Sequence, residues 1–216
     1  MEIVNGERLV LGTCYYPEHW DESLWRDDLR RMLENGIEVI RIAEFAWSKI
    51  ERYEGVFNYD FFDRFLDAAA EMGMKVIFCT PTATPPAWLT EKYPEVLNAT
   101  MDGVLYRHGG RRHYNYNSPK YQELTRIIVE KSASHYAKHP AIIGWQIDNE
   151  INCEKNEFYS ESDTIAFRKF LMEKYGSIDA LNDAWGTNFW NQTYNSFEEV
   201  HVPRTTPVSY THLTLP

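Results

Sequence analysis

The residues best suited to chemistry are Asp148, Asn149 and Glu150, which follow the apolar stretch Ala141–Ile147 (AIIGWQI). A partly buried carboxyl group has a raised pKa and can hold a proton near neutral pH. Such a group can protonate the departing oxygen of a glycosidic bond while a second carboxylate acts on the opposite side of the sugar. The amide of Asn149 is suited to hydrogen-bonding a sugar hydroxyl. An Asn-Glu pair by itself is also typical of an exposed helix N-terminus, so its position in the fold matters.

The surrounding sequence alternates short apolar runs with segments of helical periodicity. Strands are predicted at Leu9–Tyr15, Ile37–Ala43, Met74–Thr80 and Ala141–Ile147, and helices at Asp21–Asn35, Tyr59–Met72, Lys120–Lys138 and Asp163–Tyr175. Gly36, Gly73 and Gly176 follow three of these helices as stop signals. Strand–helix units in succession predict parallel strands with right-handed crossovers. This is an α/β chain.

The residues at the strand ends favour a barrel over a doubly wound sheet. No glycine-rich phosphate loop follows the first predicted strand. Each strand instead ends in polar or aromatic residues, namely Tyr15, Tyr16, Glu18 and His19, then Arg41 and Glu44, then Thr80 and Thr82, then Asp148, Asn149 and Glu150. A (β/α)₈ TIM barrel builds its active site from such strand ends and needs about 250 residues. The sequence therefore predicts the N-terminal part of a barrel, with about four to five βα units.

We expect residues 1–203 to form this half barrel and residues 204–216 to be a non-native or unstructured tail. The stretch Ser209–Pro216 resembles translated library-adapter sequence, and a genuine Thr-rich linker is the alternative.

Several strand-end residues have a structural interpretation beside the functional one. Arg41 is either an ion-paired structural residue or a group that contacts a ligand hydroxyl or orients Glu150. Glu44 is a candidate binding or supporting residue and a weak candidate nucleophile. Asp148 is expected to hydrogen-bond a loop because its side chain points away from that of its neighbour. Glu18 and His19 are expected to form a structural network.

Composition excludes several classes of partner. The net charge is −10 and no Lys/Arg cluster stands clear of acidic residues, which argues against nucleic acid. No apolar run of about 18 residues predicts a membrane helix, and no signal peptide is visible at the N-terminus, so a cytoplasmic location is expected. Cys14, Cys79 and Cys153 lie far apart and the histidines show no ligand spacing, so neither a metal nor a cofactor is expected.

Six sequence blocks, taken in order, resemble glycoside hydrolase family 42, the β-galactosidases of clan A. They are Gly12–Trp20 (GTCYYPEHW), Ile40–Trp47 (IRIAEFAW), Thr80–Trp88 (TPTATPPAW), Arg111–Tyr114 (RRHY), Gly144–Glu150 (GWQIDNE) and Leu181–Trp190 (LNDAWGTNFW). The resemblance implies a retaining enzyme that cleaves terminal non-reducing β-D-galactosides, with Glu150 as acid/base. It implies that Asn149 and Arg112 contact the galactosyl unit and that Trp190 lines its subsite.

The resemblance also implies features that this chain does not contain. The family's nucleophile is a Glu on the seventh strand, beyond residue 216, so the fragment alone is expected to be inactive. Full-length members often form trimers. Some members bind structural zinc through four cysteines, whose positions correspond here to Asn115 and to about Tyr159, Glu161 and Thr164, so a zinc-free member is expected.

Two alternatives stay open from the sequence. One is another clan A glycosidase, such as a β-mannanase or an endoglucanase. The other is a non-catalytic carbohydrate-binding barrel. The blocks Arg111–Tyr114 and Trp185–Trp190 favour the galactosidase interpretation.

Overall fold

The computed structural model describes residues 9–151 and 153–204. The tail expected at 204–216 therefore lies outside the described residues, except for Arg204. The chain divides into two compact units. Unit 1 comprises residues 1–92 and 123–153, and unit 2 comprises residues 93–122 and 154–216. Among the described residues, no helix is long and apolar enough to cross a membrane.

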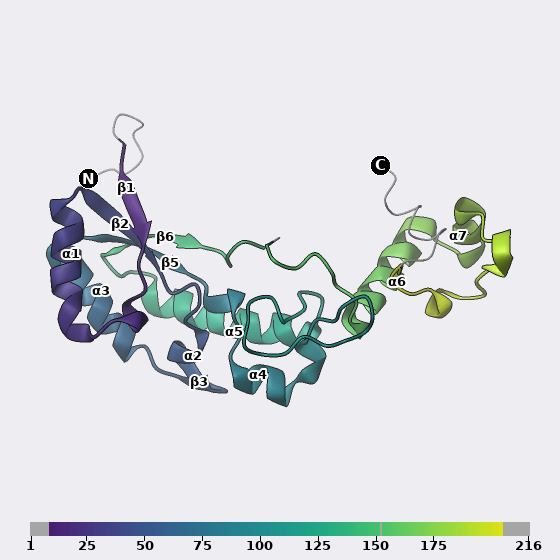
Figure 1. The fold of residues 1–216 in the computed structure, drawn as a ribbon, viewed down its shortest axis with the longest axis horizontal. Helices are drawn as coiled ribbons and strands as arrows, with labels where there is room; N and C mark the ends of the chain where they lie inside the picture. The colour runs from purple at the N-terminus through teal and green to yellow at the C-terminus, as the bar shows by residue number, and fades with distance from the viewer. Residues whose placement is uncertain (1–8, 152, 205–216) are drawn as a thin grey trace. The chain divides into compact units, whose positions relative to one another are not determined.

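Unit 1 is built on a four-stranded parallel sheet whose spatial order follows the chain (Figure 1). Its strands are β1 (Leu11–Cys14), β2 (Ile37–Ile42), β5 (Lys75–Cys79) and β6 (Ile142–Gln146). The register places Cys14 beside Arg41 and Cys79 beside Gln146. Every crossover steps in the same direction, as in a barrel wall, whereas a doubly wound sheet reverses direction. All four predicted strands are confirmed, each with slightly shorter bounds.

The two faces of this sheet differ because side chains alternate along a strand. Ile40, Ile42 and Phe78 are fully buried. On the packed face, Phe78 contacts Phe62 and Tyr136, with ring centroids 5.6 and 4.8 Å apart. On the other face, Arg41 and its neighbours line a cavity of about 360 Å³. The helices of unit 1 are α1 (Trp25–Glu34), α3 (Asp60–Met72) and most of α5 (Pro119–Tyr136), close to the predicted segments.

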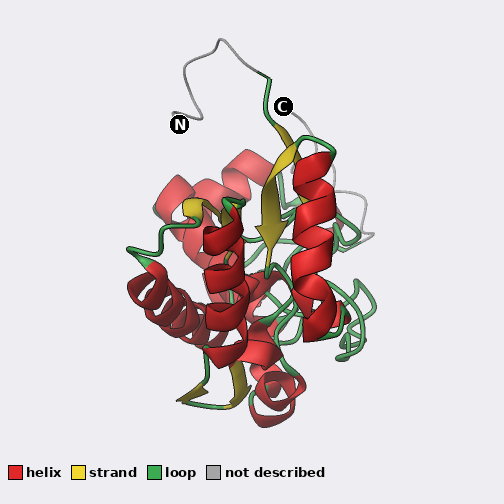
Figure 2. Ribbon diagram, turned by 90° about the vertical axis from the view of Figure 1, so that its left-hand side faces the viewer, coloured by secondary structure: helices red, strands yellow, loops and turns green. Residues whose placement is uncertain are grey.

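Short elements between the main strands are not predicted by periodicity. They are α2 (Trp47–Ile50), the hairpin β3 (Glu51–Tyr53) and β4 (Val56–Phe57), and α4 (Ala87–Lys92). The hairpin stands apart from the main sheet (Figure 2). The buried carboxylate of Glu51 stabilises the hairpin. This carboxylate accepts hydrogen bonds from Trp47 Nε1 and from the Gly55 N–H, both at 2.7 Å. Single 3₁₀ turns occur at Pro17–His19, Glu22–Leu24, Pro81–Ala83, Pro94–Val96 and Phe197–Glu199. The turn Phe189–Asn191 is irregular, because Trp190 has a left-handed φ of 55°.

Unit 2 has a small helical core of its own. Its helices are α6 (Glu161–Tyr175), which was predicted, and α7 (Ile178–Trp185), which was not. They enclose the buried residues Leu171, Leu181, Trp185 and Val200. Ser160 and Asp163 form a capping box at the start of α6, and Gly186 ends α7 with a left-handed φ of 62°.

Candidate functional site

An ion pair between the partly exposed Arg41 and the buried Glu44 lies at the carboxyl end of β2. Glu44 has no exposed surface, and its Oε1 accepts a hydrogen bond from Arg41 Nη2 at 2.8 Å. The hydroxyl of Tyr16, which follows β1, donates to the same oxygen at 2.8 Å. Burial, and then this hydrogen bond and the Glu44 charge, raise the pKa of the Tyr16 phenol. The negative charge of Glu44 is therefore held between a fixed cation and a phenol that stays protonated.

Hydrogen bonds continue from this pair to the end of β6. Arg41 Nη1 donates to Gln146 Oε1 at 2.9 Å. Gln146 Nε2 donates to the carbonyl oxygen of Asp148 at 2.8 Å and to Asn149 Oδ1 at 3.1 Å. Asn149 Nδ2 lies 3.5 Å from Glu150 Oε2. Four of the residues singled out in the sequence, Arg41, Glu44, Asn149 and Glu150, are thus brought together in unit 1.

Asp148 has the structural role expected of it, although it lies beyond the end of β6 and has a left-handed φ of 53°. Its side chain is 8% exposed, and its Oδ2 accepts a hydrogen bond from Thr82 Oγ1 at 3.1 Å. Its backbone N–H donates to Thr80 Oγ1 at 2.7 Å. These bonds tie the residues after β6 to those after β5, so the prediction that Asp148 hydrogen-bonds a loop is confirmed.

Two local expectations are wrong. The acid role assigned to Glu150 from the sequence requires a partly buried carboxyl group, but the residue is exposed in this chain. A Glu18–His19 network was also expected. The carboxylate oxygens of Glu18 are instead buried without a hydrogen-bond partner, and burial raises the pKa of this group. The His19 ring stacks on Tyr16 at a centroid distance of 5.1 Å.

The other two candidates, Arg112 and Trp190, belong to unit 2. Arg112 is 1% exposed, and its Nη1 donates to Tyr114 Oη at 2.7 Å and also to Tyr116 Oη. Two phenols therefore hold its guanidinium group in place. Trp190 is 66% exposed and stacks on Phe189, with ring centroids 4.9 Å apart. An exposed indole of this kind is available to pack against an apolar face of a ligand.

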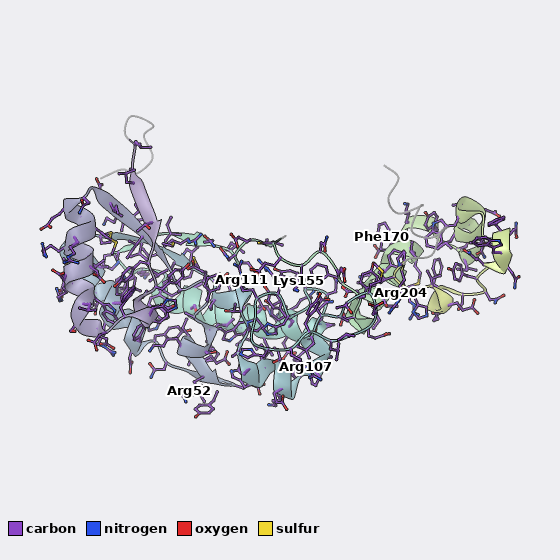
Figure 3. The ribbon with its side chains drawn as sticks, in the orientation of Figure 1. Arg52, Arg107, Arg111, Lys155, Phe170 and Arg204 are labelled. Carbon is purple, nitrogen blue, oxygen red and sulfur yellow. The ribbon has the colours of Figure 1, made fainter. Side chains whose placement is uncertain are left out.

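Two basic side chains of unit 2, Arg111 and Lys155, contact an acidic and an aromatic neighbour, respectively. Arg111 Nη1 lies 3.5 Å from Glu154 Oε1. Lys155 Nζ lies 4.5 Å from the ring centroid of Tyr106. Figure 3 labels both cations among the side chains of the molecule.

From the sequence, Tyr16 is named only as one of several strand-end residues, and Gln146 is not singled out. Tyr16 donates a hydrogen bond to the candidate residue Glu44, and Gln146 joins the candidate residues Arg41 and Asn149. Gln146 had a detectable signal. It is the polar residue at the end of an otherwise apolar strand, two positions after Gly144, so strand alternation places it on the same side as that glycine.

The comparisons with known proteins agree on one family. The family model described as beta-galactosidase, glycoside hydrolase family 42, matches residues 14–215. The chain belongs to glycoside hydrolase family 42. A β-galactosidase from a Thermus species is 46% identical over 198 residues, which is 91% of this chain and 31% of the relative. One from Halorubrum lacusprofundi is 42% identical over 201 residues, which is 93% of this chain and 29% of the relative.

Solved structures of the family have the same fold. The β-galactosidase from Marinomonas ef1 superposes with a TM-score of 0.88 at 44% identity, and the match covers 92% of this chain and 30% of that one. The parallel sheet of unit 1 is therefore part of a (β/α)₈ barrel, as predicted. This chain spans about 30% of the length of the family members it matches.

Asn115, one of the positions that the resemblance matches to a zinc ligand of some family members, belongs here to a polar network. The buried Asn115 donates through Nδ2 to Ser160 Oγ at 2.7 Å and to Asp163 Oδ2. Asn117 Nδ2 donates to Asp163 Oδ1 at 2.8 Å. Structural zinc takes cysteine thiolates and imidazoles, and this set of amides, a hydroxyl and one carboxylate does not fit it. Within residues 9–151 and 153–204, no group of three or more His, Cys, Asp or Glu is placed to hold a metal ion.

Proposed function

We propose that this chain is the N-terminal part of the catalytic barrel of a retaining β-galactosidase, with Glu150 as the acid/base. The observation that carries the proposal is the position of Asn149 and Glu150 directly after β6, joined by side-chain hydrogen bonds to the ends of β1 and β2. Barrel enzymes place their reacting groups at this end of the strands. Family membership supports a β-galactoside or a galactose-containing oligosaccharide as the substrate.

In the proposed reaction, the Glu150 carboxyl group gives its proton to the glycosidic oxygen as the bond to the galactosyl carbon breaks. A second carboxylate about 5–5.5 Å away attacks that carbon and forms a covalent glycosyl intermediate. Glu150, now ionised, then takes a proton from the water that releases galactose. The family resemblance puts the second carboxylate beyond residue 216, so we propose that the fragment alone does not turn over substrate.

Backbone strain supports the choice of site residues independently of the resemblance. Outside glycine, a left-handed φ is uncommon and costs free energy, and residues that adopt it cluster at functional sites. Among the described residues, seven other than glycine have a positive φ, and three of the seven are Arg112 (61°), Glu150 (46°) and Trp190 (55°). We propose that Arg112 and Trp190 contact the galactosyl unit, Arg112 through hydrogen bonds and Trp190 through its ring.

Replacement of Glu150 by Gln in the complete protein tests the acid role. We expect kcat/KM on lactose, which has a poor leaving group, to fall about 1,000-fold, and on a nitrophenyl β-galactoside much less. Activated leaving groups depart with little protonation, which explains the difference. Glu130→Gln, on the exposed surface of α5, is the matched control and should leave both rates unchanged. An equal loss on both substrates in Glu150→Gln would contradict the proposal.

Two further properties of the complete protein are proposals. We propose a trimer, on the family resemblance alone, and the mass of the complete protein in solution tests it. We propose a cytoplasmic location, which suits the free thiols of Cys14, Cys79 and Cys153. Cell fractionation tests the location.

A further inference from the structure

A carboxamide side chain can turn either its oxygen or its NH₂ group toward a ligand, and the two ends have nearly the same shape. The end that Asn149 presents therefore depends on its neighbours. A neighbouring guanidinium group fixes the orientation of a carboxamide, because it can only donate hydrogen bonds and must therefore face the carboxamide oxygen. The hydrogen bonds that begin at Arg41 consequently run in one direction.

This direction can be followed from residue to residue. Arg41 Nη1 lies 2.9 Å from one end of the Gln146 carboxamide, which must therefore be the oxygen. The other end of Gln146 is then the NH₂ group, 2.8 Å from the Asp148 carbonyl oxygen and 3.1 Å from Asn149 Oδ1. Both of those atoms act as acceptors. With its oxygen engaged by Gln146, Asn149 directs its NH₂ group toward Glu150, where Nδ2 lies 3.5 Å from Oε2.

Arg41, the residue at which this series of hydrogen bonds begins, is fixed in place by its neighbours. Arg41 also donates to Glu44, which has no exposed surface and receives a second hydrogen bond from Tyr16. Moving Arg41 away would leave a buried carboxylate without its cation, which is strongly destabilising. The orientation of Gln146 is therefore fixed by a charge pair that lies 105 residues earlier in the sequence.

We infer that Gln146 is a positioning residue, which holds the Asn149 amide so that it presents hydrogen-bond donors. Asn149 then donates to an oxygen atom of the substrate, most directly the sugar 2-hydroxyl, whose hydrogen bonds strengthen in the transition state. Gln146 acts through Asn149 and does not itself touch the sugar. This inference rests on the function proposed above.

The test is Gln146→Glu in the complete protein. Glutamate keeps the size of the side chain and an acceptor for Arg41, but it replaces the Nε2 donor with an oxygen that faces Asn149 Oδ1. We expect kcat/KM on an aryl β-galactoside to fall about 100-fold, as for a small misplacement of a reacting group. Asn35→Asp, at the exposed end of α1, makes the same chemical change away from the site and should alter the rate less than about twofold.

Two comparisons separate positioning from general damage. On the aryl 2-deoxy-β-galactoside, which lacks the hydroxyl, the Gln146→Glu loss should shrink to about tenfold or less. In an Asn149→Ala background, adding Gln146→Glu should cost less than about threefold, because the group that Gln146 positions is already gone. Equal losses on both substrates, or full additivity with Asn149→Ala, would overturn the inference. If Gln146→Glu does not fold, Gln146→Met removes the same donor without adding a charge and undergoes the same comparisons.

The two proposals fail in distinguishable ways. The proposed function fails if Glu150→Gln lowers activity equally on lactose and on the nitrophenyl β-galactoside. It also fails if this variant keeps full activity on both substrates. If Glu150→Gln behaves as expected and Gln146→Glu affects both sugar substrates equally, only the positioning role fails.

Discussion

The two units hold their candidate residues by different means. In unit 1, Arg41 and Gln146 are 105 residues apart in sequence and are joined by a side-chain hydrogen bond across the ends of parallel strands. In unit 2, Arg112 is held by Tyr114 and Tyr116, which are only two and four residues away. The first arrangement depends on the register of a sheet, and the second on the conformation of one loop. Changes in unit 1 should therefore affect the fold as a whole, and changes in unit 2 should act more locally.

The largest expected effect comes from removing the cation of the buried pair. Arg41→Met should lower the free energy of unfolding of the complete protein by about 3 kcal/mol, because it leaves the Glu44 carboxylate buried and uncompensated. Water partly screens the charge of Arg41, since its side chain is 35% exposed, so the loss lies at the low end of the range for a broken buried pair. Urea unfolding measures it. The double variant Arg41→Met with Glu44→Leu removes both charges and should recover part of the loss. A loss below about 1 kcal/mol in the single variant would show that this pair does not hold the strand ends together.

An intermediate effect is expected in the polar network of unit 2. Asn115→Ala removes donors to Ser160 and to Asp163, and Asp163 is only 5% exposed. Leaving a buried acceptor unsatisfied should cost about 2 kcal/mol. Asn117→Ala removes a 2.8 Å bond to the same carboxylate from an exposed residue and should cost less. Thermal unfolding compares the two variants, and added zinc should leave the wild-type midpoint unchanged. A zinc-dependent rise in the midpoint would contradict the assignment of this network as a substitute for metal.

The smallest effect concerns the pH dependence of unit 2. His113 is 2% exposed, and burial lowers its pKa below the usual value. In the unfolded chain a histidine has a pKa of about 6.5. The unfolded state therefore gains protons first as the pH falls, so stability is fully present above this pH and declines below it.

His113→Gln should reduce the difference in melting temperature between pH 7.5 and pH 5.5. His201→Gln, at an exposed histidine, should keep the wild-type difference. An unchanged pH dependence in His113→Gln would show that this imidazole does not contribute to it.

Local chemistry made much of the fold predictable. Gly73 ends α3 with a left-handed φ of 81°, and this requirement was visible as a glycine after a helical pattern. The strands of unit 1 were predictable because their runs are apolar and rich in β-branched residues. The hairpin at Glu51–Phe57 and the helix α7 were missed, since short elements depend on particular partners such as the buried Glu51 carboxylate.

The sequence predicted several residues of the candidate site, but it did not predict the hydrogen bonds that join them. Asn149 and Glu150 stand out because a strand delivers consecutive polar residues at its end. The part played by Gln146 was not predictable, because its partners Arg41 and Asn149 are identified only when β2, β5 and β6 are set in register.

The order of residues alone determined the parallel βα architecture, the family and the position of Glu150 after the fourth strand of the sheet, because periodicity, stop signals and motifs are properties of neighbouring residues. Only the tertiary structure decided that Glu44 is buried and that Arg41 orients Gln146 and through it Asn149. These outcomes depend on which side chains meet across strands separated by tens of residues, and no local pattern specifies those meetings.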